Sequence, residues 1–133
     1  MSTSTATVNS RTVHYNLTPI EIQGESYEVE AATIYEAYMG YENHGLLIAN
    51  LYFAAPSWGQ REPAYNRSAE ALDHYLRGVL TVTRASDWSK VVNTPVLALR
   101  KSFMGPIEGF ASPDQKRILL FNGGHRSEVI LRD

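Results

Sequence analysis

The stretch that decides the fold runs from Tyr27 to Tyr65 and reads YEVEAATIYEAYMGYENHGLLIANLYFAAPSWGQREPAY. Residues 27–39 alternate with a period of two and are rich in β-branched and aromatic side chains, which is typical of a half-buried strand. Residues 46–53 are apolar on both faces except at Asn50, as expected of an interior strand. A short polar segment with glycine at each end joins the two and predicts a hairpin.

The segments on either side of this hairpin complete an α+β pattern. Residues 66–84 change to an apolar spacing of three and four, which predicts one main amphipathic helix packed on the sheet. Short apolar-rich segments between turn residues predict further strands at residues 11–16, 20–23, 96–100, 106–110, 117–121 and 128–131. We therefore predict an α+β fold with a mostly antiparallel, curled sheet and one main helix at residues 66–84.

Length and composition bound the class of protein. The chain has 133 residues, of which 44% are hydrophobic and 20% charged, and this suits one globular domain. We assign the Ser/Thr-rich residues 1–10 to a flexible N-terminal arm and residues 11–133 to a single α+β domain. The absence of cysteine excludes disulfides and thiolate metal sites, and it fits a cytoplasmic location.

The charge and hydropathy patterns indicate which classes of binding partner to expect. The formal net charge of −2 argues against nucleic acid as a partner. No apolar run reaches the length of a membrane span, and the first residues lack the pattern of a secretory signal, so we expect no membrane association. Basic residues concentrate in the second half and glutamates in the first, an asymmetry that is compatible with a homo-oligomer.

Two adjacent loops concentrate the candidate chemistry. In the first loop Glu42 lies two residues before His44, a pair that can act as a general base or can simply hold its own hairpin loop in place. The second loop offers aromatic, amide and cationic side chains: Trp58, Gln60, Arg61 and Tyr65. Aromatic rings stack on planar ligands, and amide and guanidinium groups orient them, so the two loops together predict a ligand-binding site. The same side chains also suit a protein interface.

Other polar motifs carry less chemistry. The four histidines lie far apart in the chain and show no metal-binding spacing, so we expect neither a metal nor another cofactor: His14, His44, His74 and His125. Residues 123–126 read GGHR, which can form an anion-binding nest but is more typical of a hairpin turn.

The residues of the two loops also resemble a known family. The sequences Glu42-Asn43-His44-Gly45-Leu46 and Trp58-Gly59-Gln60, followed by Tyr65, are similar to small uncharacterised proteins of phages and prophages. Members carry an acidic-Asp/Asn-His-Gly-aliphatic loop, a Gly-Gln step and then an aromatic residue. The chain departs from the family at Pro63-Ala64, where members commonly have two glycines. The resemblance implies a phage-type setting, hence the host cytoplasm, and brings no biochemical activity.

Three functions are compatible with these residues, and we favour the first. It is a non-enzymatic accessory binding protein that acts on host machinery or immune signalling, through a host protein or a small nucleotide-like ligand held by the two loops. The second is a small hydrolase that uses His44 with Glu42. The third is a structural or assembly protein that self-associates.

Overall fold

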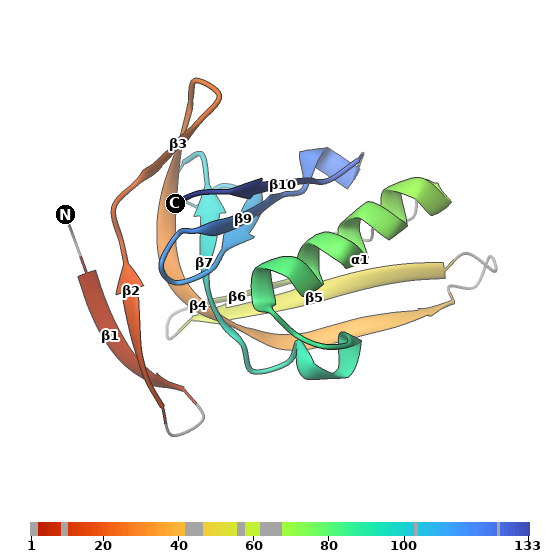
Figure 1. The fold of residues 1–133 in the computed structure, drawn as a ribbon, viewed down its shortest axis with the longest axis horizontal. Helices are drawn as coiled ribbons and strands as arrows, with labels where there is room; N and C mark the ends of the chain where they lie inside the picture. The colour runs from red at the N-terminus through yellow and green to blue at the C-terminus, as the bar shows by residue number, and fades with distance from the viewer. Residues whose placement is uncertain are drawn as a thin grey trace.

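The computed structural model describes residues 3–8, 11–41, 47–55, 58–61, 68–102, 104–124 and 126–133, and within these ranges it describes Val8, Trp58, Gln60 and Arg61 by their backbone alone. Figure 1 shows the elements along the chain. They are β1 (Thr3–Val8), β2 (Arg11–Asn16), β3 (Ile20–Ile22), β4 (Glu25–Tyr41), β5 (Leu47–Ala55), β6 (Trp58–Arg61), α1 (Ala69–Thr83), the 3-10 turn η1 (Trp88–Lys90), β7 (Pro95–Arg100), β8 (Gly109–Ala111), β9 (Arg117–Leu120), the 3-10 turn η2 (Asn122–Gly124) and β10 (Glu128–Leu131).

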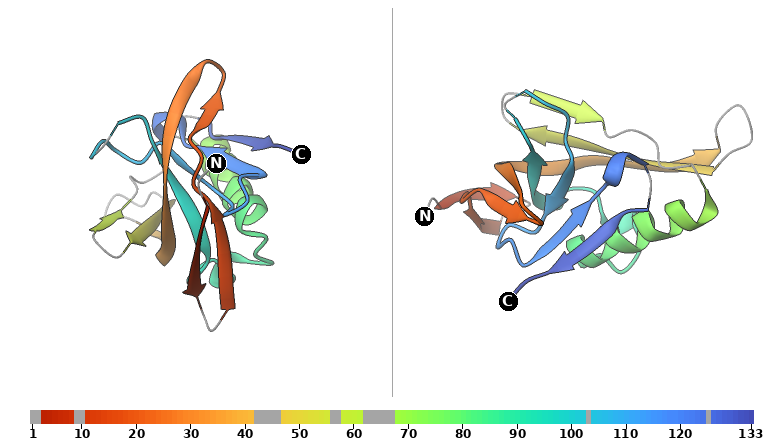
Figure 2. Two further views of the ribbon diagram at one scale, coloured as in Figure 1. Left: turned by 90° about the vertical axis from the view of Figure 1, so that its left-hand side faces the viewer. Right: turned by 90° about the horizontal axis from the view of Figure 1, so that it is seen from above.

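The main sheet has the strand order β10-β9-β8-β7-β4-β5-β6, with every neighbouring pair antiparallel, and β3 pairs with the start of β4. The helix α1 contacts β5, near one end of the strand order, and also β9 and β10, at the other end. The sheet therefore curls around the helix as a half-barrel (Figures 1 and 2). This architecture confirms the predicted α+β class, the curled antiparallel sheet and the single main helix.

The long strand β4 organises the sheet, as its alternating sequence predicts, but it contains a break in the alternation. Its pairing with β5 shifts register between Ile34 and Glu36, which is the signature of a β-bulge. Before the bulge, Val29 packs on the face away from α1, whereas Ala37 beyond it packs on the helix side. The prediction of one uninterrupted alternation over residues 27–39 is therefore wrong, because an extra residue at Tyr35 reverses the faces.

Two apolar cores lie on opposite faces of the sheet. The first fills the space between the sheet and α1, and at its centre the rings of Phe53, Phe110, Phe121 and Tyr75 lie tilted with centroids 5.5–6.5 Å apart. The second lies under β2 and β3 and includes Tyr15, Ile20, Leu97, Leu99 and Ile118. The fold therefore has three layers: α1, the main sheet, and the segment that contains β2 and β3.

Part of the predicted N-terminal arm at residues 1–10 forms a strand, which together with β2 makes a two-stranded ribbon. Residues Thr3–Val8 form β1, which pairs with β2 along its whole length. The sequence of β1 shows no apolar alternation, because every described side chain in this strand is exposed. The strand is defined by its pairing with β2. Figures 1 and 2 show the ribbon projecting from one end of the molecule. Among the described residues, no helix has the length and apolar character needed to cross a membrane.

Candidate functional site

The residues that the sequence predicts as a site fall largely outside the part of the chain that the structure describes. Glu42, His44 and Tyr65 lie outside it altogether. The other three lie in the strand β6, so the prediction of a loop at these residues is wrong: pairing with β5 places Trp58 opposite Ala55, Gln60 opposite Phe53 and Arg61 opposite Tyr52. Whether these six residues meet, and whether they bind a ligand, stays a prediction.

A different cleft lies within the described residues, between the β2 strand of the ribbon and the segment that leads from α1 into β7. Its volume is about 710 Å³, within the range of about 300–1,000 Å³ that is typical of small-molecule sites. Its lining comes from two distant parts of the sequence. The ribbon contributes Arg11, Thr12, Val13 and His14, and the rest of the molecule, here called the body, contributes Thr83, Lys90, Val92, Asn93, Thr94 and Pro95.

Hydrogen bonds hold the body wall of the cleft on the main sheet. The backbone N–H of Asn93 donates to Ile34 O over 2.7 Å, and Ile34 N–H donates to Thr94 O over 3.0 Å. Asn93 adopts a left-handed φ of 69°, a conformation that asparagine tolerates better than most residues. Before this turn, Asp87 caps η1, the turn that contains Lys90, by accepting from Ser89 N–H over 2.9 Å. This wall is therefore well defined.

The ribbon wall is anchored at one end. Tyr15 is buried in the second core, and Asn16 N–H donates to Pro113 O over 2.9 Å. The side-chain amide of Gln115 adds bonds to Asn16 O and Thr18 O, at 2.8 and 2.7 Å. From this anchor β2 runs back to Arg11, which is exposed. The anchored end thus positions His14, and Arg11 lies farther out along the ribbon.

The lining of the cleft is cationic. Arg11 and Lys90 come from opposite walls, and the described residues of the lining include no carboxylate. Among the described residues, neither Arg11 nor Lys90 forms an ion pair within 4.0 Å. Two negative groups lie nearby: the Asp87 carboxylate, which interacts with Lys90 from outside the lining, and the C-terminal end of α1 near Thr83, with a partial charge of about −0.5. The two cations exceed their sum. An anion is therefore the ligand that this surface favours.

The C-terminal end of α1 is itself neutralised by arginine. The Nε–H of Arg117 donates to Val82 O over 3.1 Å and so satisfies one of the last carbonyls of the helix. Burial is the main cause that lowers the pKa of Arg117, and the neighbouring Arg84 lowers it further. The carboxylate of Asp114 raises this pKa in turn, so the role of Arg117 that the contacts support is to satisfy the end of the helix.

The hydroxyl groups in the lining are partly committed to the fold. Thr83 Oγ1 donates to Val79 O over 2.8 Å, and Thr94 Oγ1 donates to Val91 O over 2.6 Å. Their protons are used, so these threonines can only accept from a ligand. The side chains of Arg11, Thr12 and Lys90 offer donors to a ligand. This donor set suits the oxygen atoms of a phosphate or carboxylate.

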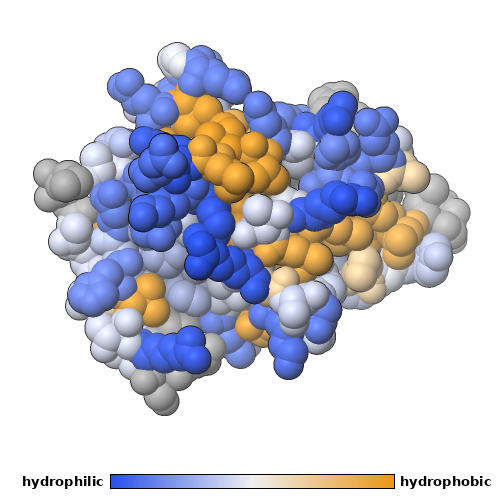
Figure 3. All heavy atoms as spheres, viewed as in Figure 1, coloured by the Kyte–Doolittle hydropathy of each residue, from blue (hydrophilic) through white to orange (hydrophobic). Residues whose placement is uncertain are grey.

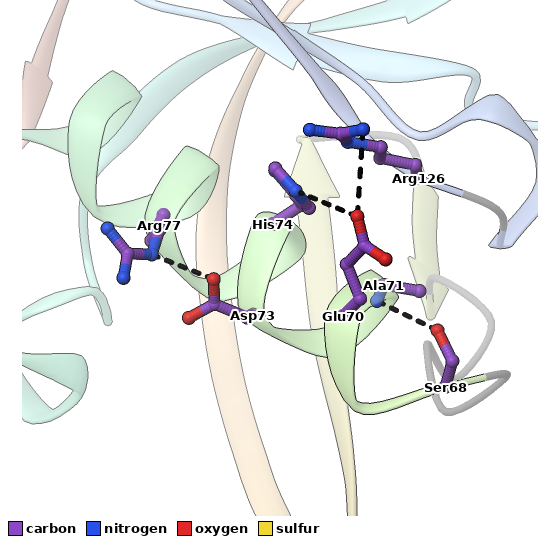
Figure 4. Close-up of polar contacts among 7 residues, drawn as sticks. All are labelled: Ser68, Glu70, Ala71, Asp73, His74, Arg77 and Arg126. Carbon is purple, nitrogen blue, oxygen red and sulfur yellow. Dashed lines mark hydrogen bonds and ion pairs between the residues drawn. The ribbon is translucent and has the colours of Figure 1, made fainter.

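The other end of α1 carries a polar cluster, shown in Figure 4. Glu70 Oε1 lies 3.7 Å from His74 Nε2 and 3.6 Å from Arg126 Nη1, and Arg77 Nε–H donates to Asp73 Oδ2 over 2.9 Å. These groups are largely exposed, and pairs spaced i,i+4 on a helix contribute about 0.2–0.5 kcal/mol each. We therefore assign the cluster to helix stability. The described residues also contain no group of three or more potential metal ligands.

Comparison with protein families, with curated proteins and with solved structures finds no match to this chain. The resemblance to small phage proteins stays a prediction. Sequence reasoning noted Lys90 only as part of the basic second half and did not pair it with Arg11, because the two residues lie about eighty residues apart and neither lies in a motif. The signal that could have found them is the presence of cations and hydroxyl residues, without an acidic residue, in residues 11–14.

Proposed function

We propose that this protein is a non-enzymatic binding protein that holds a small, phosphate-bearing, nucleotide-like ligand in the cleft between the ribbon and the body. The observation that carries the proposal is the placement of Arg11 and Lys90 on opposite walls of a cleft of about 710 Å³ whose described lining residues include no carboxylate. Phosphate oxygens would accept from the two cations and from Thr12. The apolar side chains Val13 and Val92 offer surface to a base or another planar group.

Binding without catalysis follows from the residue types in the lining. Among the described residues of the lining, no carboxylate is present to orient His14, as a general base usually requires. The resemblance to phage proteins extends the proposal to a phage-type accessory protein. Such a protein would act on host machinery or immune signalling by capturing this ligand in the host cytoplasm.

The test measures binding of ATP, inorganic pyrophosphate and adenosine by isothermal titration calorimetry, with native mass spectrometry of the purified protein to find any anion retained from cells. We expect ATP and pyrophosphate to bind, and uncharged adenosine to bind more weakly or not at all. Arg11→Gln and Lys90→Gln should each weaken ATP binding about tenfold or more, because a hydrogen bond to a charged group contributes about 1.5–3 kcal/mol.

The matched control is Arg77→Gln, which removes an exposed cation from α1 outside the cleft lining and should leave ATP binding unchanged. Higher salt should weaken binding in the wild type, since the site is open and its cations are exposed. Equal affinity of the wild type and both cleft variants would contradict the proposal. So would the absence of binding by both phosphate probes in a protein that retains no anion.

A further inference from the structure

The strand β10 forms an unprotected edge of the main sheet. It pairs with β9 alone among the described strands. Its residues Val129 and Leu131 are 38% and 68% exposed, and Figure 3 shows apolar surface over β10. Of the devices by which native sheets blunt such edges, β10 lacks proline, lysine and a bulge, although it is short and carries Glu128. An apolar strand that keeps open backbone groups at a sheet edge is a template for pairing with another strand.

The direction of the backbone groups shows which residues would pair. Arg132 N–H donates to Lys116 O over 2.7 Å, so this group points toward β9. Backbone groups alternate along a strand, so those of Ile130 and Glu128 also point toward β9, whereas those of Val129 and Leu131 point away from the sheet. The two outward-pointing residues are thus the ones with exposed apolar side chains.

We infer that β10 is the interface with a second copy of this chain, paired antiparallel about a two-fold axis at Ile130. In this register, Val129 lies opposite Leu131 of the second copy, and the outward N–H and C=O groups of the two residues meet in a hydrogen-bonded pair. Glu128 then lies opposite Arg132 of the second copy. Each dimer therefore gains two apolar pairs and two pairs of opposite charge, which is the self-complementarity that a two-fold interface requires.

Charge complementarity also favours this occupant over other edges and partners. The exposed strand β1 is another open edge, but its Thr, Ser and Ala residues carry no charge and would not fix a register. A strand from an unrelated protein would not by necessity match Glu128 and Arg132 with the correct spacing. Glu128 is already positioned, because it accepts from Gln23 Nε2 over 3.2 Å.

The inference is independent of the proposed ligand, since none of these residues lines the cleft. A four-residue edge buries less than the roughly 800 Å² per partner of a standard interface, so we expect a dimer that dissociates on dilution. Sedimentation velocity between about 10 and 500 μM should show conversion of monomer to dimer. A single monomeric species over this whole range would overturn the inference.

Charge reversal gives the sharper test. Arg132→Glu and Glu128→Arg should each weaken the dimer about tenfold or more, because two attractive pairs become two repulsive pairs. The double variant, with both reversals in one chain, should restore wild-type dimerisation. Glu28→Lys on the exposed side of β4 is the control and should have no effect. A dimer that ignores both single reversals, or a double variant as weak as either of them, would overturn the inference.

A proline substitution tests the backbone pairing of β10 separately from the contribution of its side chains. The N–H of Val129 points away from β9, so Val129→Pro removes a bond of the dimer without removing a bond of the fold. We expect loss of the dimer with an unchanged far-ultraviolet circular dichroism spectrum. A folded Val129→Pro variant that dimerises as the wild type does would overturn the pairing.

Discussion

Gly78 is buried where α1 packs against Leu119 of the sheet, and its replacement by alanine tests how tightly these layers pack. A methyl group at this position would overlap with Cδ1 of Leu119 in β9, and it would lie 3.2 Å from Cδ2 and 3.3 Å from Cγ. Leu119 has no exposed surface, and it packs in the core that contains Phe110 and Phe121. The leucine therefore has no open space into which it can move.

Two effects of opposite sign determine the result. In the interior of an exposed helix, Gly→Ala raises stability by about 1 kcal/mol. Overpacking a close-packed core lowers it by about 1–3 kcal/mol. Because three atoms of one buried side chain must move at once, we expect overpacking to win, so that Gly78→Ala lowers the free energy of unfolding by roughly 1–2 kcal/mol.

The same substitution can be made in a Leu119→Ala variant, which should itself lower the free energy of unfolding by about 2–5 kcal/mol. In that background the new methyl group enters the vacated space, and Gly78→Ala should raise the free energy of unfolding by about 1 kcal/mol. Equilibrium unfolding in urea of the wild type, both single variants and the double variant measures the reversal of sign. Stabilisation by Gly78→Ala in the wild-type background, or additive effects, would refute the packing argument.

Two further predictions concern local polar contacts. Ser68→Ala should lower the free energy of unfolding by about 1 kcal/mol in urea titrations, because Ser68 Oγ caps α1 by accepting from a backbone N–H over 3.0 Å. For Asp114, burial raises the pKa, but hydrogen bonds from Ser112 and Lys116 and the charge of Arg117 together lower it by more. The pKa of Asp114 in the folded state therefore lies below its value in the unfolded state. Asp114→Asn should therefore destabilise the fold at pH 7, and its difference from the wild type should shrink as the pH falls below about 4; a difference that does not depend on pH would contradict this.

The fold was predictable where residue periodicity reports burial. The helical spacing at residues 66–84 and the alternation at residues 27–39 reflect side chains that pack on the two cores, and both elements are present. The bulge at Tyr35 could not be predicted, because tyrosine and alanine are tolerated on either face and the sequence continues to alternate through it. The strand β1 could not be predicted either, since none of its described side chains is buried.

The cleft was harder to predict than the fold, because its walls are joined by tertiary structure alone. Sequence reasoning favours residues that lie close together in a loop, and so it selected residues 42–45 and 58–65. The cleft instead combines residues 11–14 with residues 83–95, which meet because Asn16 is anchored on the body at Pro113 and the turn at Asn93 is anchored on β4. No local pattern encodes either anchor.

The two walls of the cleft differ in how they are held, and this has a consequence for binding. Backbone hydrogen bonds to Ile34 fix the body wall, whereas the ribbon is anchored at its Asn16 end and runs from there to an exposed Arg11. A two-stranded ribbon without a covering layer has little stability of its own. An anion that bridges Arg11 and Lys90 would therefore fix the outer end of the ribbon on the body, and part of the binding free energy would be spent on ordering it.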